Sequence, residues 1–320
     1  MFASSRHLRE RGVMGMNERN ANFVQRFNQR SHYPLVDDKL QTKRLAMASG
    51  IAVPELYAVM STPADTRDLA ERVAGREQFV IKPTHGSGGD GIMVITGRNV
   101  RRAGLYRLSD GSVVSESDIR YHVTNIISGR YSLGGHRDCA MIEYCVQADP
   151  VFAEVAHNGV PDVRVLVFRG YPAMAMVRLP TRESKGKANL HQGAVGAGID
   201  LSTGRTVYAV HDSQAVEEHP DTGALVTGIE VPHWQTLLEL AASCYDLTGL
   251  GYLGVDLVLD RDRGPLILEL NARPGLGIQI ANRMGLRTRL AMLEERPDGL
   301  PVAERLKFVR TEFGVSAQAD

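Results

Sequence analysis

Two apolar segments near the C-terminal end constrain the fold of this chain more than any other feature. They read YLGVDLVL (residues 252–259) and LILELN (residues 266–271), and the charged sequence DRDRGP separates them. Each segment contains one acid, Asp256 in the first and Glu269 in the second. Short apolar runs on either side of a polar, glycine-containing loop are typical of an antiparallel hairpin. The pattern therefore predicts two paired strands, each with one acid in an apolar setting.

A hairpin folded symmetrically about the DRDRGP loop pairs Leu259 with Leu266 and Asp256 with Glu269. Directly opposed side chains have Cβ atoms roughly 5 Å apart. Two carboxylates at that distance do not both stay ionised in apolar surroundings without a cation. The register therefore predicts a cation site. The alternative is a surface hairpin with scattered acids, although acids inside apolar runs are seldom left unpaired.

Alternation along the second strand extends this site. Asn271 and Arg273 fall on the face of Glu269, whereas Leu268 and Leu270 point to the opposite face and into a core. Carboxylates and amide oxygens are ligands that Mg²⁺ prefers, together with substrate phosphates. The site consequently predicts a phosphate-bearing ligand that other parts of the chain must help to bind.

Composition excludes several other classes of protein. At 320 residues the chain is long enough for two or three lobes, and 37 basic against 37 acidic residues give no support for a nucleic-acid-binding surface.

The three cysteines, Cys139, Cys145 and Cys244, have no paired spacing. We therefore expect neither a disulfide framework nor a zinc site, and we expect a reducing, cytoplasmic location. No apolar run approaches a membrane span. The basic start, MFASSRHLRERG, faintly resembles a transit segment, but an arginine-bearing surface helix is the preferred interpretation.

The stretch from Phe79 to Ile95 contains a glycine-rich loop. Gly86, Gly88 and Gly91 match GxGxxG, but a strand instead of a helix follows, which argues against a dinucleotide-binding fold. Lys82 precedes the loop, whereas a kinase lysine follows its loop. We predict a strand, loop, strand flap whose backbone N–H groups close over phosphates, with Lys82 adding a charge. Ser87 would add a hydroxyl donor. The alternative is an ordinary flexible hairpin tip.

Further segments show weaker signals. A helix is expected from Pro34 to Gly50 with Lys39 in its first turn, where the lysine serves an anion or pairs with a neighbouring acid. Strands are expected at 140–147 and, as a meander, at 161–180. The glycine- and lysine-bearing loop that follows contains His191, which we interpret as a structural histidine. A helix is expected at 231–247.

The order of these features resembles the ATP-grasp superfamily. A lysine-bearing helix, a lysine-ended strand with a glycine flap, an EY strand edge, DVR, an arginine-ended strand, NLHQG, GVDLV and ELNARPG follow one another over about residues 33 to 290. The chain is most similar to the α-L-glutamate ligase-related branch, near the ribosomal-protein glutamate ligases. The resemblance implies an α+β, ATP-grasp fold of two lobes with antiparallel sheets that clasp ATP.

The resemblance also implies a role for each of these residues. ATP contacts fall on Lys39 and Lys82, the flap Ser87, Gly88 and Gly89, the adenine hinge Glu143, Tyr144, Cys145 and Val146, Asp162 near the ribose, and Lys187 and Asn189 near the phosphates. Asp256, Glu269 and Asn271 match the ligands of two Mg²⁺ ions, which Mn²⁺ can replace. Arg178 and Arg273 would face the γ-phosphate and the tetrahedral centre.

Two departures from the family are visible. Only 38 residues precede Lys39, so the domain that usually comes first is expected to be reduced. The chain between Glu143 and Asp162 is longer than in those ligases, which affects the ribose assignment. The expected organisation is an N-terminal arm (1–33), a lobe with the glycine flap (34–150), a lobe with the metal hairpin (151–290) and a C-terminal tail (291–320).

The activity that the resemblance implies is an ADP-forming carboxylate–amine ligase, adding glutamate or another amino acid to a carboxylate-bearing peptide, protein or metabolite. No nucleic-acid or membrane partner is expected, and the oligomeric state stays open. Two alternatives would use the same residues: a phosphotransferase and a non-catalytic ATP-binding sensor or scaffold. Replacing Asp256 by Asn or Glu269 by Gln is expected to abolish ADP formation with little loss of fold.

Overall fold

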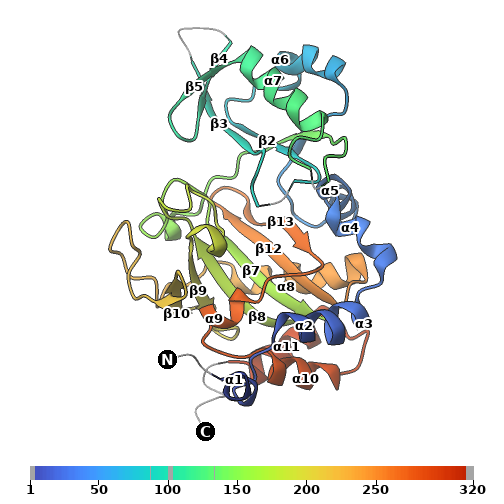
Figure 1. The fold of residues 1–320 in the computed structure, drawn as a ribbon, viewed down its shortest axis with the longest axis vertical. Helices are drawn as coiled ribbons and strands as arrows, with labels where there is room; N and C mark the ends of the chain where they lie inside the picture. The colour runs from blue at the N-terminus through green and yellow to red at the C-terminus, as the bar shows by residue number, and fades with distance from the viewer. Residues whose placement is uncertain (1–3, 87, 100–103, 133, 315–320) are drawn as a thin grey trace. The chain divides into compact units, whose positions relative to one another are not determined.

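The computed structural model describes residues 4–86, 88–99, 104–132 and 134–314. Contacts divide the chain into two units (Figure 1). Unit 1 holds residues 4–37, 44–52 and 147–314, and unit 2 holds residues 38–43 and 53–146. The division after Val146 lies near the predicted boundary after residue 150. The predicted arm and tail do not stand apart, because both fall within unit 1.

Unit 2 is a six-stranded antiparallel sheet covered by helices. The sheet has the order β1-β6-β2-β3-β4-β5. Its strands are β1 (Leu56–Met60), β2 (Phe79–Pro83), β3 (Met93–Arg98), β4 (Leu105–Leu108), β5 (Val113–Ser115) and β6 (Ala140–Glu143), and its helices are η3 (Pro63–Asp68), α6 (Leu69–Arg72) and α7 (Glu116–Ile127). Ile119, Val123 and Ile126 of α7 recur at helical spacing and join Phe79 and Ile81 in one apolar core.

Unit 1 is built on a seven-stranded antiparallel sheet. Its order is β11-β10-β9-β8-β7-β12-β13. The strands are β7 (Asp162–Phe168), β8 (Tyr171–Leu179), β9 (Val195–Ile199), β10 (Thr206–His211), β11 (Gln214–Ala215), β12 (Tyr252–Asp260) and β13 (Gly264–Asn271). The helices are α1 (Ser5–Glu10), α2 (Met16–Glu18), η1 (Arg19–Val24), α3 (Gln25–Phe27), η2 (Arg30–His32), α4 (Pro34–Asp37), η4 (Pro150–Phe152), η5 (Leu190–Gln192), α8 (Trp234–Thr248), α9 (Gly277–Ala281), α10 (Arg287–Glu294) and α11 (Val302–Glu312). Helix α5 (Lys39–Ala48) contributes its first half to unit 2 and its second half to unit 1. Both units are therefore α+β with antiparallel sheets, as predicted.

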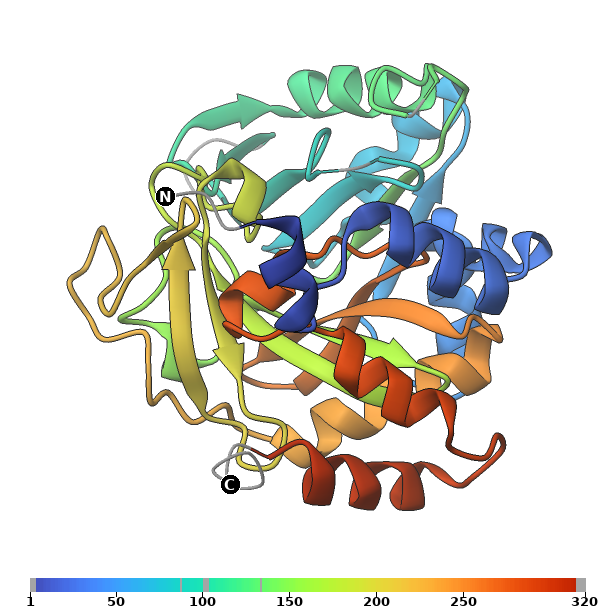
Figure 2. The same cartoon turned by 60° about the horizontal axis from the view of Figure 1, so that its bottom comes forward.

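Helix α8 packs across β7, β8, β12 and β13 on one face of the seven-stranded sheet (Figure 1). Its apolar stripe confirms the helix expected at 231–247. The C-terminal helices α10 and α11, drawn in red in Figure 2, contact β8. Every helix among the described residues is too short or too polar to cross a membrane.

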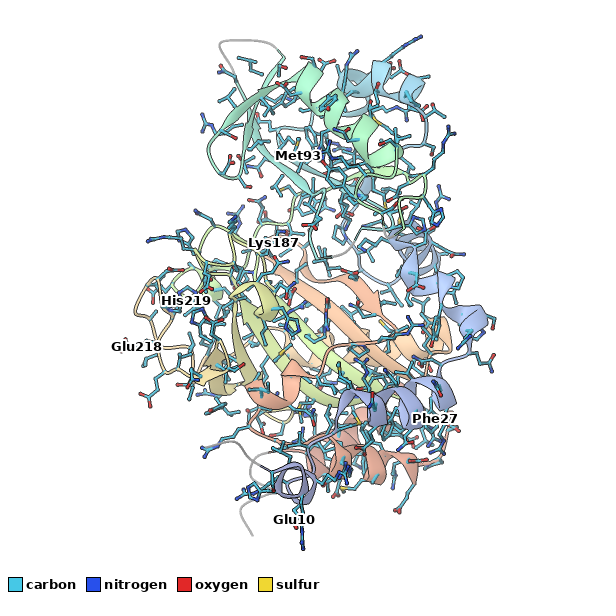
Figure 3. All side chains as sticks on the ribbon, viewed as in Figure 1. Glu10, Phe27, Met93, Lys187, Glu218 and His219 are labelled. Carbon is cyan, nitrogen blue, oxygen red and sulfur yellow. The ribbon has the colours of Figure 1, made fainter. Side chains whose placement is uncertain are left out.

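The N-terminal segment covers part of the opposite face. Phe23 and Phe27 pack edge-on against Phe168 of β7 at 5.6 and 4.8 Å between ring centroids, and Phe27 is labelled in Figure 3. Asn28 is 3% exposed and hydrogen-bonds the backbone of Tyr252 in β12. The described part of the predicted N-terminal arm is largely helical and docks on the sheet. Two aromatic rings among polar neighbours were the signal that this segment docks on a sheet.

The hairpin of β12 and β13 has the predicted acid pair but a different turn. Asp256 is opposite Glu269, as predicted, whereas Leu259 pairs with Pro265 instead of Leu266. The loop is shorter than DRDRGP because Asp260 pairs with Gly264, which has a φ of +72°. A bulge between Asp256 and Leu257 then adds one residue to β13 and restores the pairing of the acids.

Candidate active site

A row of ionic side chains lies on one face of β7, β8 and β12. Arg164 in β7 is directly opposite Asp256 in β12, and its guanidinium binds both carboxylate oxygens, with Nη2 2.6 Å from Oδ2 and Nε against Oδ1. Asp162 in β7 is directly opposite Arg178 in β8. They form a second bidentate ion pair, in which Nε lies 2.5 Å from Oδ1 and Nη2 lies 2.6 Å from Oδ2. Alternation along β7 places Asp162 and Arg164 on the same face. Strand register thus assembles the row.

Arg178 links the two pairs, because its Nη2 also lies 2.9 Å from Oδ2 of Asp256. Asp162 is 6% exposed and Asp256 4% exposed. Burial opposes ionisation of Asp256, but Arg164 and Arg178 outweigh burial and hold the pKa of Asp256 below its ordinary value. Burial raises the pKa of Asp162 to about 6, and the nearby Asp256 charge adds to that rise. The contacts with Arg164 and Arg178 therefore keep Asp256 ionised, the form that can bind a metal ion.

The other predicted metal ligands lie beside Asp256. Glu269 is opposite it in β13 and half-buried, and the Asn271 amide nitrogen is 3.5 Å from Oδ2 of Asp256. A carboxylate has about four lone-pair positions, and Oδ1 of Asp256 accepts from Arg164 alone among these contacts. The donor set, two carboxylates and an amide, fits a hard oxygen-binding cation such as Mg²⁺.

Unit 2 contains a second buried ionic cluster. Glu143 at the end of β6 is 2% exposed and lies 2.5 Å from Nζ of Lys82 and 2.9 Å from Nζ of Lys43. Lys43 also donates to the carbonyl of Pro54. Burial raises the cost of charging Glu143, but the two ammonium groups outweigh it and lower the pKa of Glu143. Burial lowers the pKa of Lys43. Two cations here share one acid.

Lys39 and the glycine loop are in contact within unit 2. Asp38 caps α5 by accepting from the Leu40 N–H at 2.9 Å, and Lys39 Nζ donates to the carbonyl of Gly86 at 2.6 Å. Gly88 and Gly89 have φ values of +63° and +79°, which L side chains rarely adopt. Ser87, the predicted hydroxyl donor, lies outside the described residues. The helix-borne lysine thus holds the loop that was predicted to bind phosphate.

Two glycines of the GxGxxG match have packing reasons. A Cβ on Gly86 would lie 2.4 Å from the Pro83 side chain, and a Cβ on Gly91 would lie 2.7 Å from the Tyr131 ring. Their spacing therefore reflects the folding of the loop as much as ligand binding.

The predicted adenine hinge follows β6. Glu143 uses its side chain in the lysine cluster, and the Tyr144 N–H donates to the Glu55 carbonyl at 2.8 Å. Cys145 is buried and Val146 half-buried. An adenine contact at this segment stays a prediction.

Lys187 and Asn189 lie on the loop after β8, where Figure 3 labels Lys187. The Asn189 side chain caps η5 by accepting from the His191 N–H at 3.0 Å. The His191 side chain is exposed, and its interpretation as a structural histidine stays a prediction. A contact of Lys187 or Asn189 with phosphate stays a prediction, as does a contact of Asp162 with ribose.

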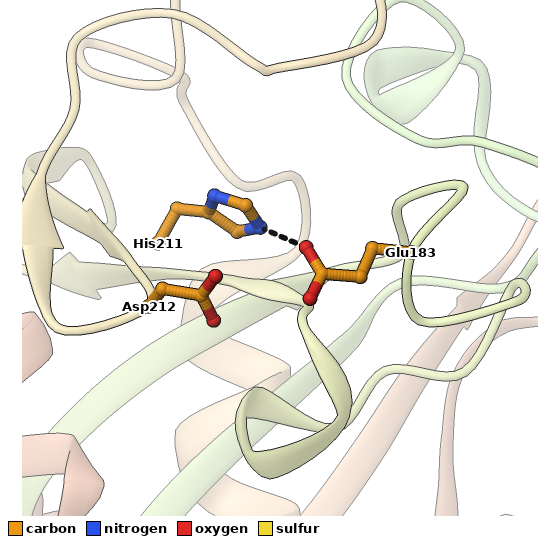
Figure 4. Close-up of side chains that lie close together, drawn as sticks. All are labelled: Glu183, His211 and Asp212. Atoms are coloured by element: carbon orange, nitrogen blue, oxygen red, sulfur yellow. Dashed lines mark ion pairs between the residues drawn. The ribbon is translucent and has the colours of Figure 1, made fainter.

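Glu183, His211 and Asp212 gather beside this loop, with ligand atoms within 4.8 Å of one another (Figure 4). His211 Nε2 lies 3.4 Å from the Glu183 carboxylate and 3.1 Å from the Gly193 carbonyl. A Cβ on Gly193 would lie 2.7 Å from Glu183, so glycine makes room for the acid. Because the ring nitrogen that faces Glu183 is already hydrogen-bonded to a carbonyl, we interpret the group as an anchor that ties the loop to β10.

A family model described as sugar-transfer associated ATP-grasp matches residues 18–295. The match spans most of the chain. This protein belongs to the sugar-transfer associated ATP-grasp family. The predicted ATP-grasp membership is thereby confirmed, and with it the α+β fold of two antiparallel sheets.

Relatives of this ATP-grasp chain carry names from the predicted branch. A probable alpha-L-glutamate ligase of Sodalis glossinidius is 25% identical over 252 residues, which are 78% of this chain and 62% of that protein. The chain thus spans about three fifths of the length of that relative. Among solved structures it is similar to the ATP-grasp ligase PsnB in complex with a minimal precursor, with 14% identity, 83% of this chain and 61% of that chain covered and a TM-score of 0.45. It is also similar to a D-alanine–D-alanine ligase from Bacillus anthracis in complex with ATP, with 14% identity, coverage of 88% and 70%, and a TM-score of 0.45.

Two residues in these clusters had no predicted role. Lys43 follows Lys39 by four positions and so lies on the same helical face, which was the available signal. Arg164 follows Asp162 by two positions and so lies on the same strand face. Neither spacing identifies Glu143 or Asp256 as the partner, because those contacts depend on the order of strands in the sheets.

Proposed function

We propose that this chain is an ATP-dependent ligase that activates a carboxylate as an acyl phosphate and joins it to an amine. The observation that carries the proposal is the buried Asp162–Arg178–Asp256–Arg164 row with Glu269 beside it, in a member of an ATP-grasp family. Ionic groups are costly to bury, and a buried cluster of them is a candidate functional site.

Metal binding is assigned to Asp256, Glu269 and Asn271. We propose two Mg²⁺ ions, which Mn²⁺ can replace. Bound Mg²⁺ would neutralise the charge on ATP phosphates during phosphoryl transfer. Arg164 positions Asp256 by holding both of its oxygens, so the carboxylate presents its remaining lone pairs in a fixed direction.

ATP binding is assigned to both units. In unit 2, Lys39, Lys82 and the loop with Gly88 and Gly89 would contact phosphates, and the segment from Glu143 to Val146 would contact adenine. In unit 1, Lys187 and Asn189 would contact phosphates and Asp162 the ribose. The cluster of Lys82 and Lys43 around Glu143 supports the phosphate role, because its two ammonium groups exceed its one acid and leave an excess of positive charge.

Catalysis is assigned to Arg178 and Arg273. A carboxylate oxygen of the first substrate attacks the γ-phosphorus, and the bond to the bridging oxygen breaks, giving ADP and an acyl phosphate. An amine then attacks the acyl carbon, loses a proton, and expels inorganic phosphate. Guanidinium groups aimed at charge that develops in these steps lower the barrier. The flap would exclude water that hydrolyses the acyl phosphate.

The names of the relatives support amino-acid substrates. We propose glutamate or another amino acid as one substrate and a peptide, a protein or a small metabolite as the other. The first experiment measures ADP release with MgATP over a panel of carboxylic acids, with hydroxylamine added to trap the acyl phosphate as a hydroxamate.

The ligase proposal predicts ADP and a hydroxamate for at least one acid. A stable phosphorylated product without hydroxamate would indicate a phosphotransferase. ATP binding without ADP release for any acid would indicate a sensor or scaffold. Either result contradicts the ligase.

A further inference from the structure

A cavity of about 460 Å³ lies within unit 1, at the end of the β12–β13 hairpin. Three arginines line it, Arg19, Arg30 and Arg273, and the rest of its lining is polar, aromatic or aliphatic, with no acid. Within the described part of the chain, none of these three arginines forms an ion pair with a carboxylate. Unpaired guanidinium groups around one cavity favour a ligand that supplies the negative charge.

Arg19 is a fixed wall of the cavity. It is 8% exposed, and its Nη1 donates to the Pro274 carbonyl at 2.7 Å, while Nε and Nη2 donate to the Asn20 side chain at 3.1 and 2.8 Å. A guanidinium has five N–H donors, so donors remain for a ligand. Arg19 also opens the π-helical turn η1, a geometry that recurs at functional sites.

Two further lining residues, Asn28 and Arg273, have defined contacts. Asn28 is 3% exposed and donates to the carbonyls of Tyr252 and Ala272 at 2.8 and 2.9 Å, which ties the N-terminal segment to the ends of both hairpin strands. The Arg273 guanidinium stacks 4.8 Å from the ring centre of Tyr33. Arg273 and Arg30 are exposed, so charge faces the solvent at the mouth.

Residues at the cavity lie close in sequence to the proposed metal ligands on β12 and β13. Arg273 follows Asn271 by two positions. Pro274 packs over Gly254, where a Cβ would lie 2.6 Å from its ring, and Gly254 precedes Asp256 by two positions. Arg273 would therefore contact a ligand in the cavity and also take part in the proposed reaction.

We infer that this cavity binds the acid that the enzyme activates, and that Arg19 and Arg30 select a small carboxylic acid that bears a second negative group, carboxylate or phosphate. The inference rests on the proposed ligase function. The carboxylate to be activated would contact Arg273, and the second negative group would contact Arg19 and Arg30. The volume suits a ligand of amino-acid to dipeptide size, since small-molecule pockets start at about 300 Å³.

The test compares Arg30→Gln with the wild-type protein by calorimetry without ATP. The probes are L-glutamate, its amide L-glutamine with one negative group fewer, succinate, O-phospho-L-serine and inorganic phosphate. We expect at least one probe with a carboxylate and a second negative group to bind at least tenfold more tightly than glutamine, and Arg30→Gln to weaken its binding about 10- to 100-fold, the usual loss of a charge-assisted hydrogen bond. Dicarboxylate and phosphate probes distinguish the two sources of charge.

Arg26→Gln is the matched control. Arg26 lies in the same segment, is exposed, pairs with Glu294 at 2.8 Å and does not line the cavity. Binding should change less than twofold. A further variant, Arg30→Lys, keeps the charge and should recover part of the affinity.

Several outcomes would overturn the inference: no probe acid binds, acids bind no better than glutamine, or Arg30→Gln and Arg26→Gln act alike. The ligase proposal fails separately. If acids bind through Arg30 but none stimulates ADP release, the cavity selects acids as inferred, and the ligase proposal fails together with the activation of the bound acid. If acids stimulate ADP release with a KM that Arg30→Gln leaves unchanged, the ligase stands without the cavity assignment.

Discussion

The two buried ionic clusters differ in balance. In unit 2, Lys43 and Lys82 share Glu143, so cations exceed acids within the cluster. In unit 1, Asp162 forms a bidentate ion pair with Arg178 and Asp256 with Arg164, so these two acids are balanced by two cations. An excess of cations attracts phosphate, whereas a carboxylate held by arginine can offer its remaining lone pairs to a metal ion. On the proposed function, the lysine cluster of unit 2 would contact phosphates and the Asp256 cluster of unit 1 would hold the metal ions.

The clusters also differ in rigidity. Lysine carries a compact charge at the end of a flexible side chain, whereas the planar guanidinium of arginine orients a carboxylate through two parallel hydrogen bonds. Metal ligands need fixed direction, and phosphate contacts tolerate adjustment. This difference predicts which substitutions harm the fold and which harm the reaction.

The largest expected effect is on the stability of unit 2. Glu143→Gln leaves two buried lysines without an acid, which costs roughly 3–5 kcal/mol in the free energy of unfolding. Hydrogen exchange of peptides from β2 and β6 measures this loss. Glu55→Gln is the control, because Glu55 directly precedes β1 of the same unit and its pair with Arg76, at 3.6 Å, is largely exposed. Equal protection in both variants would contradict the role of Glu143.

Asp256→Asn should lower the rate of ADP formation about 10²- to 10³-fold. It should also destabilise unit 1, because Arg164 and Arg178 lose their shared acid. The expectation of little loss of fold therefore needs correction for Asp256. Glu269→Gln should lose activity with a smaller loss of stability, since Glu269 is only half-buried.

ADP release and thermal unfolding measure the two effects separately. Asp262→Asn is the control, because Asp262 lies at the exposed loop and pairs with Arg261. Full activity in Asp256→Asn would contradict the metal assignment.

The stability contribution of Glu143 should depend on pH in a defined direction. The pKa of Glu143 in the folded protein is below its ordinary 4.5, so its contribution is present above that value and is lost as the pH falls through the folded pKa. The stability gap between the wild-type protein and Glu143→Gln should be constant from pH 7 to about pH 5 and shrink below it. A gap that grows on acidification would reverse the assigned sign. Amide exchange, corrected for its intrinsic pH dependence, measures the gap.

The smallest expected effect concerns the loop anchor. Glu183→Gln weakens an exposed contact with His211, worth about 0–1 kcal/mol, so the KM for ATP should rise no more than about fivefold. Steady-state kinetics measure this change against Glu217→Gln, an exposed neighbour. A large loss of kcat would show that Glu183 takes part in the reaction.

Strand patterns predicted much of unit 1, because alternation and apolar runs report burial directly. The acids of YLGVDLVL and LILELN are opposite each other as expected, but only because the bulge before Leu257 compensates for a shorter loop. A bulge depends on loop geometry that the apolar pattern does not encode.

Contacts between distant segments were harder to predict. The N-terminal segment looked polar, yet Phe23, Asn28 and Arg19 dock on β7, β12 and the loop after β13. Likewise, the partner of Lys82 depends on β6 lying beside β2, although β6 begins at Ala140, 57 positions after Pro83. Local periodicity carries no information on such sheet order.

One measurement tests the central claim most directly. An acid that supports turnover is supplied with ¹⁸O in its carboxylate, and the products with MgATP and an amine are followed by ³¹P NMR. The proposed chemistry predicts ADP and inorganic phosphate that carries one ¹⁸O, because the carboxylate oxygen leaves with the phosphoryl group. Formation of AMP and pyrophosphate, or of phosphate without the label, would contradict it.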